Sequence, residues 1–223
     1  MIHAVLLDVD GTLVLSNDAQ ARSWVEAFAQ FGYDVPFDRV RYLIGMGSET
    51  LIPKVVPGLS KENSPGKEIA ARRAEIFKST YLPTIESAPG SRALVERMKN
   101  DGLRIEVATS SPADELQPLL KVARIDDLVE KKTDASDVST AKPAPDVVDQ
   151  AMQKIGMPPK EVTMLGDTPY DIESAGKAKV GVIAVRCGGF PDEALRGALA
   201  VYDDPADLLA HYDESPLRWM ADG

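Results

Sequence analysis

The sequence predicts an α/β protein in which a doubly wound parallel sheet carries an inserted all-helical segment. Short runs rich in leucine and β-branched residues, typical of buried parallel strands, alternate with helical stripes from about residue 85 onward. One such run, at residues 5–14, precedes them, and only helical patterns separate it from the rest. We therefore expect an α/β core formed by residues 1–14 and 85–223, and a helical domain formed by residues 15–84.

Length and composition fit an ordinary globular protein. The chain has 223 residues, of which 44% are hydrophobic and 27% charged, so it can bury a sizeable core and is not expected to be disordered. Its formal net charge of -10 argues against nucleic acid as a partner, because affinity for a phosphate backbone depends on lysine and arginine. No basic block offsets this charge.

The single cysteine and the apolar runs suggest a compartment. Cys187 has no second cysteine to pair with, which favours a reducing environment, and a packing role is a simpler expectation for it than a reactive thiol. No charged leader precedes the first strand, and no run reaches the ~18 apolar residues of a membrane span. We expect a cytoplasmic protein without a membrane partner.

The helical segment begins where the hydrophobic period changes. Ser16 or Asn17 can cap a helix whose apolar residues Ala21, Trp24 and Phe28 share one face. Glycine, proline and serine then separate further helical stripes. Four helices are expected, at residues 17–31, 37–44, 49–56 and 65–81.

The remaining chain alternates helix and strand. Helices are expected at residues 91–100, 112–123, 145–155 and 170–177, with a kink at Pro118 in the second of them. Strands are expected at residues 103–109, 129–133, 162–165 and 181–185. The tail, at residues 191–212, alternates once more. Such alternation is typical of a parallel sheet covered by helices on both faces.

The first strand ends in two carboxylates, Asp8 and Asp10. Residues i and i+2 of an extended chain point the same way, so both side chains can face one small volume. At about 4 Å and an effective dielectric near 20, two such charges repel by roughly 4 kcal/mol. A cation between them would offset that cost, and aspartate can act as a covalent nucleophile in phosphoryl transfer. An ordinary strand followed by an Asp-Gly turn is the simpler alternative.

Three later segments place chemistry-bearing residues beside strand ends. Thr109 and Ser110 follow one strand, where hydroxyls and amides can bind an anion or merely form a turn. Lys142 lies in a Lys-Pro-Ala-Pro-Asp segment, whose prolines stiffen the backbone. Asp167 and Asp171 end another strand and begin a helix, so both can reach one point, and carboxylates suit Mg²⁺. Asp171 could instead serve only the helix dipole.

Together, and in this order, these segments resemble the four motifs of the haloacid dehalogenase-like hydrolase superfamily, in its phosphatase branch. The resemblance implies that Asp8 is the nucleophile and that Asp10 is the general acid/base, with its backbone carbonyl on Mg²⁺. It further implies that Thr109 and Ser110 contact the phosphate, that Lys142 neutralises charge, and that Asp167 and Asp171 hold the metal, the latter directly or through water. The first strand would lie between the strands that end at Thr109 and Asp167.

The same resemblance implies that residues 15–84 form a mobile cap whose loops select the substrate. Gly45, Gly47, Ser48 and Lys54 are the candidates for that role. From the residues alone, the Gly-Met-Gly-Ser segment is better explained as a turn between helices, because it lacks the further glycine and the lysine of a phosphate-binding loop.

The expected function is a Mg²⁺-dependent phosphomonoester hydrolase for a small phosphorylated metabolite, similar to phosphoglycolate phosphatase. A sugar-phosphate mutase of the β-phosphoglucomutase type shares the same motifs and stays an alternative, as does a non-catalytic binding module. A dehalogenase is disfavoured because that branch lacks an acid at the position of Asp10. The substrate and the oligomeric state are not determined by the sequence.

Overall fold

The computed structural model describes residues 1–129, 131–135 and 142–218. A six-stranded parallel sheet runs through it in the order β3-β2-β1-β4-β5-β6. The strands are β1 (Ala4–Leu7), β2 (Arg104–Ala108), β3 (Lys131–Thr133), β4 (Val162–Gly166), β5 (Gly181–Val185) and β6 (Ala200–Tyr202). The α/β class and the place of β1 between β2 and β4 are confirmed.

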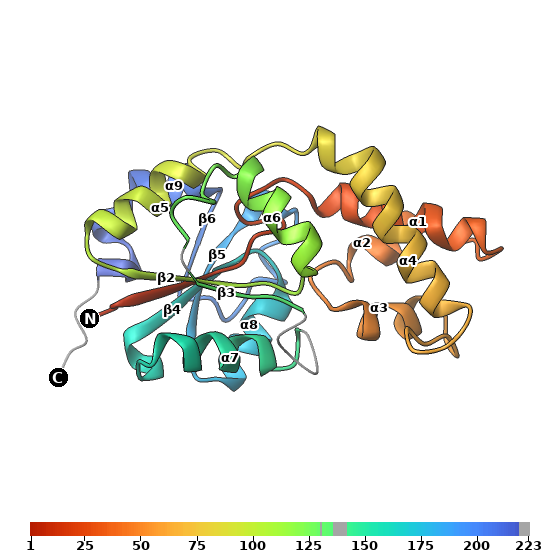
Figure 1. Ribbon diagram of the computed structural model, residues 1–223. Coiled ribbons are helices and arrows are strands. Elements are labelled where there is room, and N and C mark those ends of the chain that lie inside the picture. The colour runs from red at the N-terminus through yellow and green to blue at the C-terminus, as the bar shows by residue number, and fades with distance from the viewer. Residues whose placement is uncertain (130, 136–141, 219–223) are drawn as a thin grey trace.

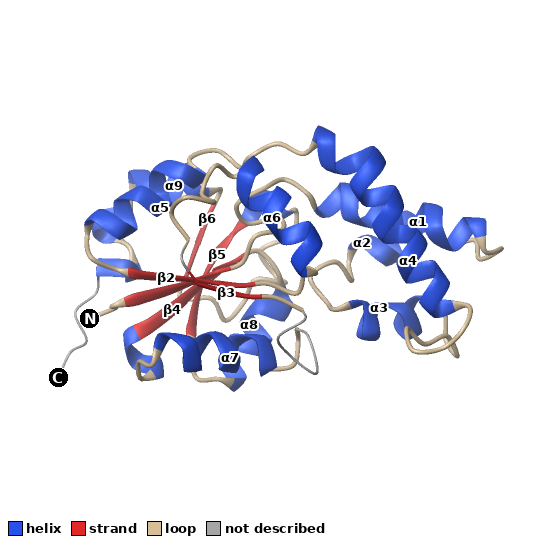
Figure 2. Ribbon diagram, in the orientation of Figure 1, coloured by secondary structure: helices blue, strands red, loops and turns tan. Residues whose placement is uncertain are grey.

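Helices cover both faces of this sheet, as Figures 1 and 2 show. Val5 and Leu7 of β1 join the apolar cluster under α5, α6 and α9, whereas Ala4 and Leu6 join the cluster under α7 and α8. Alternation along β1 thus supplies both layers of the core. The helices are α5 (Ser91–Asn100), α6 (Ala113–Val122), α7 (Asp146–Ile155), α8 (Pro169–Lys177) and α9 (Pro205–Ala210).

The insert after β1 packs around a hydrophobic cluster of its own, which includes Trp24, Phe28, Ile52 and Ile69. In Figure 1 it lies beside the end of the sheet where the strands terminate. Its elements are α1 (Asn17–Gln30), α2 (Phe37–Arg41), α3 (Ser48–Val55), α4 (Gly66–Ile76), a π turn (Phe77–Tyr81) and a 3-10 turn (Leu82–Thr84).

Several boundaries differ from expectation for local reasons. The helix expected to reach residue 44 ends at Arg41, because the amides of Leu43 and Ile44 bond three residues back and tighten the chain into a turn. Pro118 stays inside α6, which continues beyond it. The strand expected at 129–133 is described from Lys131, and Glu130 lies outside the described residues. Within the described part of the chain, no helix is long and apolar enough to span a bilayer.

Candidate active site

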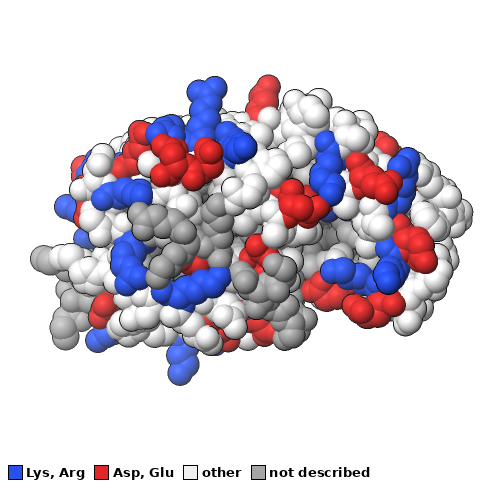
Figure 3. Space-filling model, viewed as in Figure 1, with Lys and Arg blue, Asp and Glu red and all other residues white. Residues whose placement is uncertain are grey.

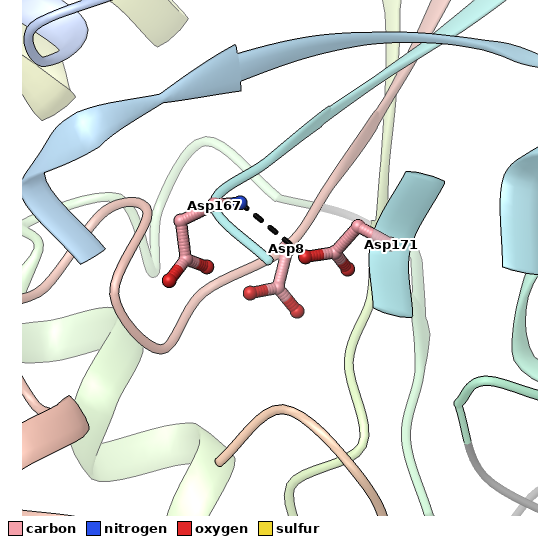
Figure 4. A group of neighbouring side chains, drawn as sticks. All are labelled: Asp8, Asp167 and Asp171. Atoms are coloured by element: carbon pink, nitrogen blue, oxygen red, sulfur yellow. Dashed lines mark hydrogen bonds between the residues drawn. The ribbon is translucent and has the colours of Figure 1, made fainter. Parts of the chain in front are cut away.

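The ends of β1 and β4 bring three carboxylates together. Asp8 follows β1, Asp167 follows β4, and Asp171 lies in the first turn of α8. Leu7 of β1 pairs in register with Leu165 of β4, so the two strands end at the same edge of the sheet. Asp8 and Asp167 therefore lie at that edge. Carboxylate oxygens of the three aspartates lie within 4.8 Å of one another, and Figure 4 shows Asp8 between the other two.

Burial makes this cluster electrostatically costly. All three aspartates are at most 5% exposed. Burial, partly offset by Lys142 and reinforced by Asp171, raises the pKa of Asp8 to about 7. Burial, together with the charges of Asp8 and Asp171, raises the pKa of Asp167 well above its usual range. Three closely spaced carboxyl groups supply the oxygen donors that suit a hard divalent cation such as Mg²⁺, and the charge of such an ion would favour their ionised forms.

Lys142 supplies the positive charge that is present. Its Nζ lies 2.6 Å from Asp8 Oδ1 and 2.7 Å from Asp171 Oδ1, and the side chain is 1% exposed. Burial alone would lower the pKa of Lys142, but Asp171 and Asp8 outweigh it and the pKa is raised. One ammonium therefore stays protonated between two of the three acids, and no second cationic side chain of the described residues contacts the cluster.

Asp10 lies next to this cluster but has separate partners. Its Oδ1 accepts hydrogen bonds from Ser16 Oγ at 2.5 Å and Gln20 Nε2 at 2.8 Å, and its Oδ2 accepts one from Ser111 Oγ. The side chain lines the same cavity as Asp8. A metal contact through the backbone carbonyl of Asp10 stays a prediction.

Three side chains that contact the acids are not among the site residues that the sequence predicts. Thr12 Oγ1 donates to Asp167 Oδ1 at 3.0 Å, and Asn17 Nδ2 donates to Asp167 Oδ2 at 2.7 Å. Ser16 was expected only as a helix cap, yet it makes no cap bond and its hydroxyl goes to Asp10. Thr12 belongs to the first motif, so the sequence could have indicated it as a site residue. For Asn17, the sequence indicates only a possible helix cap.

Close backbone approach also shapes the site. A Cβ on Gly188 would come within 1.8 Å of Asp167 Oδ2, so only glycine fits there. The Gly188 carbonyl accepts a hydrogen bond from Asn17 Nδ2 at 2.9 Å. Cys187 donates its thiol to the Gly11 carbonyl at 3.3 Å, and burial with nearby Asp167 raises the pKa of Cys187 to about 12. The thiol thus stays protonated, in keeping with a packing role.

The predicted phosphate contacts lie beside the acids. Thr109 and Ser110 line the cavity that contains Asp8. Thr109 Oγ1 accepts a hydrogen bond from the Ser111 amide at 3.1 Å, and Ser110 Oγ accepts one from the Lys142 amide at 3.3 Å. The loop after β2 is thereby tied to the lysine segment.

The cavity has a volume of about 190 Å³ and lies between the core and the insert. Sites for drug-sized ligands run to roughly 300–1,000 Å³, so this one suits a small metabolite. Of the four specificity candidates, Gly45 and Ser48 line it, and the Gly47 amide donates to the Lys142 carbonyl at 3.3 Å. Lys54 does not line it, because it lies on the exposed face of α3 while Leu51 lies on the buried one.

An α/β sheet with an acid cluster at its carboxyl edge and a helical insert above it defines a class of hydrolase. The family described as "Haloacid dehalogenase-like hydrolase" matches residues 5–185, and the chain belongs to it. Its relatives place it in the phosphatase branch. It is 28% identical to the phosphoglycolate phosphatase of Yersinia pestis over 216 residues, covering 95% of this chain and 90% of that protein.

Other similarities agree in fold but vary in extent. A crystal structure of a hydrolase from Pseudomonas syringae superposes with a TM-score of 0.88 at 29% identity, over 95% of this chain and 98% of that one. CbbY from Rhodobacter sphaeroides, solved in complex with phosphate, superposes with a TM-score of 0.78 at 25% identity, over 93% of this chain and 96% of that one. The chain also matches SUPPRESSOR OF QUENCHING 1 of Arabidopsis thaliana at 28% identity, using 83% of this chain but only 18% of that longer protein.

Proposed function

We propose that this protein is a Mg²⁺-dependent phosphomonoester hydrolase that acts on a small phosphorylated metabolite through a phosphorylated Asp8. The observation that carries the proposal is the group of three buried carboxylates around Asp8, within 4.8 Å of one another and paired with a buried lysine. A structural ion pair would need no such excess of acid, whereas a phosphate and a divalent cation together would use every group present.

Asp8, Asp167 and Asp171 would hold Mg²⁺, with the backbone carbonyl of Asp10 as a further ligand. The ion, when bound, would neutralise charge on the nucleophile and on the phosphoryl oxygens. Lys142 contacts Asp8 and Asp171 and would stabilise the same charge from the other side.

In the first step, one Asp8 oxygen forms a bond to phosphorus as the bond to the leaving oxygen breaks. Asp10 gives its proton to that oxygen, and the alcohol departs. In the second step, Asp10 takes a proton from water while the hydroxyl attacks phosphorus, which frees Asp8 and phosphate. Thr109 and Ser110 would bind the phosphoryl oxygens throughout.

We further propose that residues 15–84 act as a cap over this site. The Gly47 amide contacts the Lys142 carbonyl, and Gln20, Ser48 and Arg73 of the insert line the cavity opposite Asp8. Such a lid would exclude bulk water during attack and admit a single water for the second step. The relatives named phosphoglycolate phosphatase, and CbbY solved with phosphate, support a small phosphorylated substrate.

The central test is Asp8→Asn, assayed with p-nitrophenyl phosphate and MgCl₂. Asparagine keeps the shape of the side chain but cannot form the acyl phosphate, so turnover should fall by about 10³-fold or more. Asp34→Asn, which changes an exposed acid of the insert, is the matched control and should retain wild-type turnover. Wild-type turnover by Asp8→Asn would overturn the assignment.

The mutase alternative is tested with a sugar monophosphate in the presence of MgCl₂. A phosphatase releases free phosphate in proportion to substrate consumed. A mutase accumulates the positional isomer instead, which ³¹P NMR separates from free phosphate. Failure of wild-type protein to act on any phosphate monoester would favour a binding role.

A further inference from the structure

We propose that the leaving-group side of the cavity accepts an uncharged, hydroxyl-bearing group, and that Glu115 sets this preference by neutralising Arg73. The inference rests on the proposed phosphatase function and names its substrate class: monoesters of polyols or neutral sugars, in preference to those whose leaving group carries a carboxylate or a second phosphate.

Arg73 is the cation that would otherwise attract a charged leaving group. It lies on α4, lines the cavity, and is the only buried arginine in the part of the chain that the structure describes, at 7% exposure. Its guanidinium carbon lies 5.5 Å from the ring centre of Trp24 and 4.9 Å from that of Phe77. These two aromatic contacts fix the position of its charge at the cavity wall.

Glu115 lies directly against this charge. It is in the first turn of α6, is fully buried, and its Oε1 lies 2.7 Å from Arg73 Nη1. Two opposite charges so close present a dipole, not a net charge, to a group several ångströms away. Burial raises the pKa of Glu115 and the Arg73 guanidinium opposes the rise, so the assays below are run at pH 8 to keep the carboxylate ionised.

The other charged groups of the insert do not restore a positive surface. Besides Arg73, the one cationic residue among the described insert residues that line the cavity is Lys61, and the oppositely charged Glu62, next to it in the sequence, lines the cavity too. Figure 3 likewise shows basic and acidic side chains intermixed along the insert. The charges of these described insert residues therefore cancel, and this part of the wall offers an anionic leaving group no net attraction.

One unused acceptor favours a hydroxyl in particular. Gln20 lines the cavity and donates its Nε2 hydrogen to Asp10, while its Oε1 is buried and accepts no hydrogen bond from any described residue. A substrate hydroxyl can donate to that oxygen, but a carboxylate or phosphate oxygen cannot. A buried acceptor beside an anion would stay unsatisfied, which disfavours the anion further.

The test compares glycerol 1-phosphate with 2-phosphoglycolate, two esters of similar size whose leaving groups differ in charge. Wild-type protein should show at least about a tenfold higher kcat/KM for glycerol 1-phosphate. Glu115→Gln keeps the side-chain shape but exposes the Arg73 charge, so the ratio should shift toward 2-phosphoglycolate by about tenfold or more. The matched control is Asp114→Asn, whose wild-type carboxylate pairs with exposed Lys78, and it should keep the wild-type ratio.

A double variant keeps the inference testable if Glu115→Gln does not fold. Arg73→Met with Glu115→Met removes both buried charges, an exchange that is often neutral or stabilising, and should retain the preference for glycerol 1-phosphate. A wild-type preference for 2-phosphoglycolate, an unchanged ratio in folded Glu115→Gln, or a reversed ratio in the double variant would each overturn the inference. Cleavage of p-nitrophenyl phosphate is followed in parallel; if wild-type protein cleaves neither this ester nor the two metabolite esters, the proposed function has failed instead.

Discussion

Asp8→Asn should stabilise the metal-free protein at high pH while it abolishes turnover. Asp8 is 5% exposed, and its pKa is raised from 3.8 to about 7. Between these two values the folded state holds a proton that the unfolded state has lost. The stability that protonated Asp8 contributes to the folded state is therefore fully present below pH 3.8 and is lost as the pH rises through 7.

A shift of about three pH units corresponds to roughly 4 kcal/mol at 1.36 kcal/mol per unit, which sets the ceiling for this loss. Asparagine mimics the neutral acid and therefore avoids this loss of stability. Since about 1 kcal/mol shifts Tm by roughly 2–4 °C in a domain of this size, the ceiling of roughly 4 kcal/mol corresponds to a Tm about 8–16 °C above that of wild type at pH 8.

The assay is thermal unfolding by circular dichroism in EDTA, from pH 5 to pH 8. Asp8→Asn should already melt a few degrees above wild type at pH 5, because the loss begins at pH 3.8, and the difference should widen as the pH rises to 8. Asp34→Asn should show no such pH-dependent difference in Tm from wild type, because that acid is exposed. If Asp8→Asn melts below wild type at pH 8 in EDTA, the ionised Asp8 is stabilising and the reasoning about buried charge is wrong.

Two further predictions concern the metal. Gly188→Ala places a Cβ 1.8 Å from Asp167 Oδ2 and should raise the MgCl₂ concentration for half-maximal activity by about tenfold, whereas Gly176→Ala, which meets nothing within 4 Å, should not. An equal requirement in both alanine variants would contradict a role for Asp167 as ligand. Asp171→Asn removes one carboxylate of the cluster and should raise the same concentration by about tenfold, while added MgCl₂ restores part of the rate. Saturation at wild-type MgCl₂ would exclude Asp171 from the metal site.

Strand ends could be located from the sequence because the signals are local. The apolar run that begins at Val5 indicates a buried strand, which the structure shows as β1, and Asp8 follows it directly. The alternation of helix and strand then indicated a parallel sheet, and parallel strands deliver their carboxyl ends to one edge. For this reason the sequence predicts that Asp8, Thr109 and Asp167 lie near one another.

The specificity candidates were less predictable. Lys54 is a candidate only because the resemblance implies a cap whose residues select the substrate, and the orientation of α3 leaves this side chain exposed. Arg73 is not among the candidates from the sequence, because its partners Trp24 of α1 and Glu115 of α6 come from other elements. Which side of a short helix faces a cavity depends on packing against other elements, and no local pattern records it.

The sequence by itself determined the α/β class and the order of the motifs, because periodicity and turn residues act over a few positions. Only the tertiary structure decided what surrounds those motifs. The bond from Asn17 to Gly188 joins residues 171 positions apart, and the ion pair of Arg73 with Glu115 joins residues 42 positions apart. Such contacts depend on how the insert packs against the sheet. That packing is determined by the burial of many apolar side chains together, which no local stretch of sequence specifies.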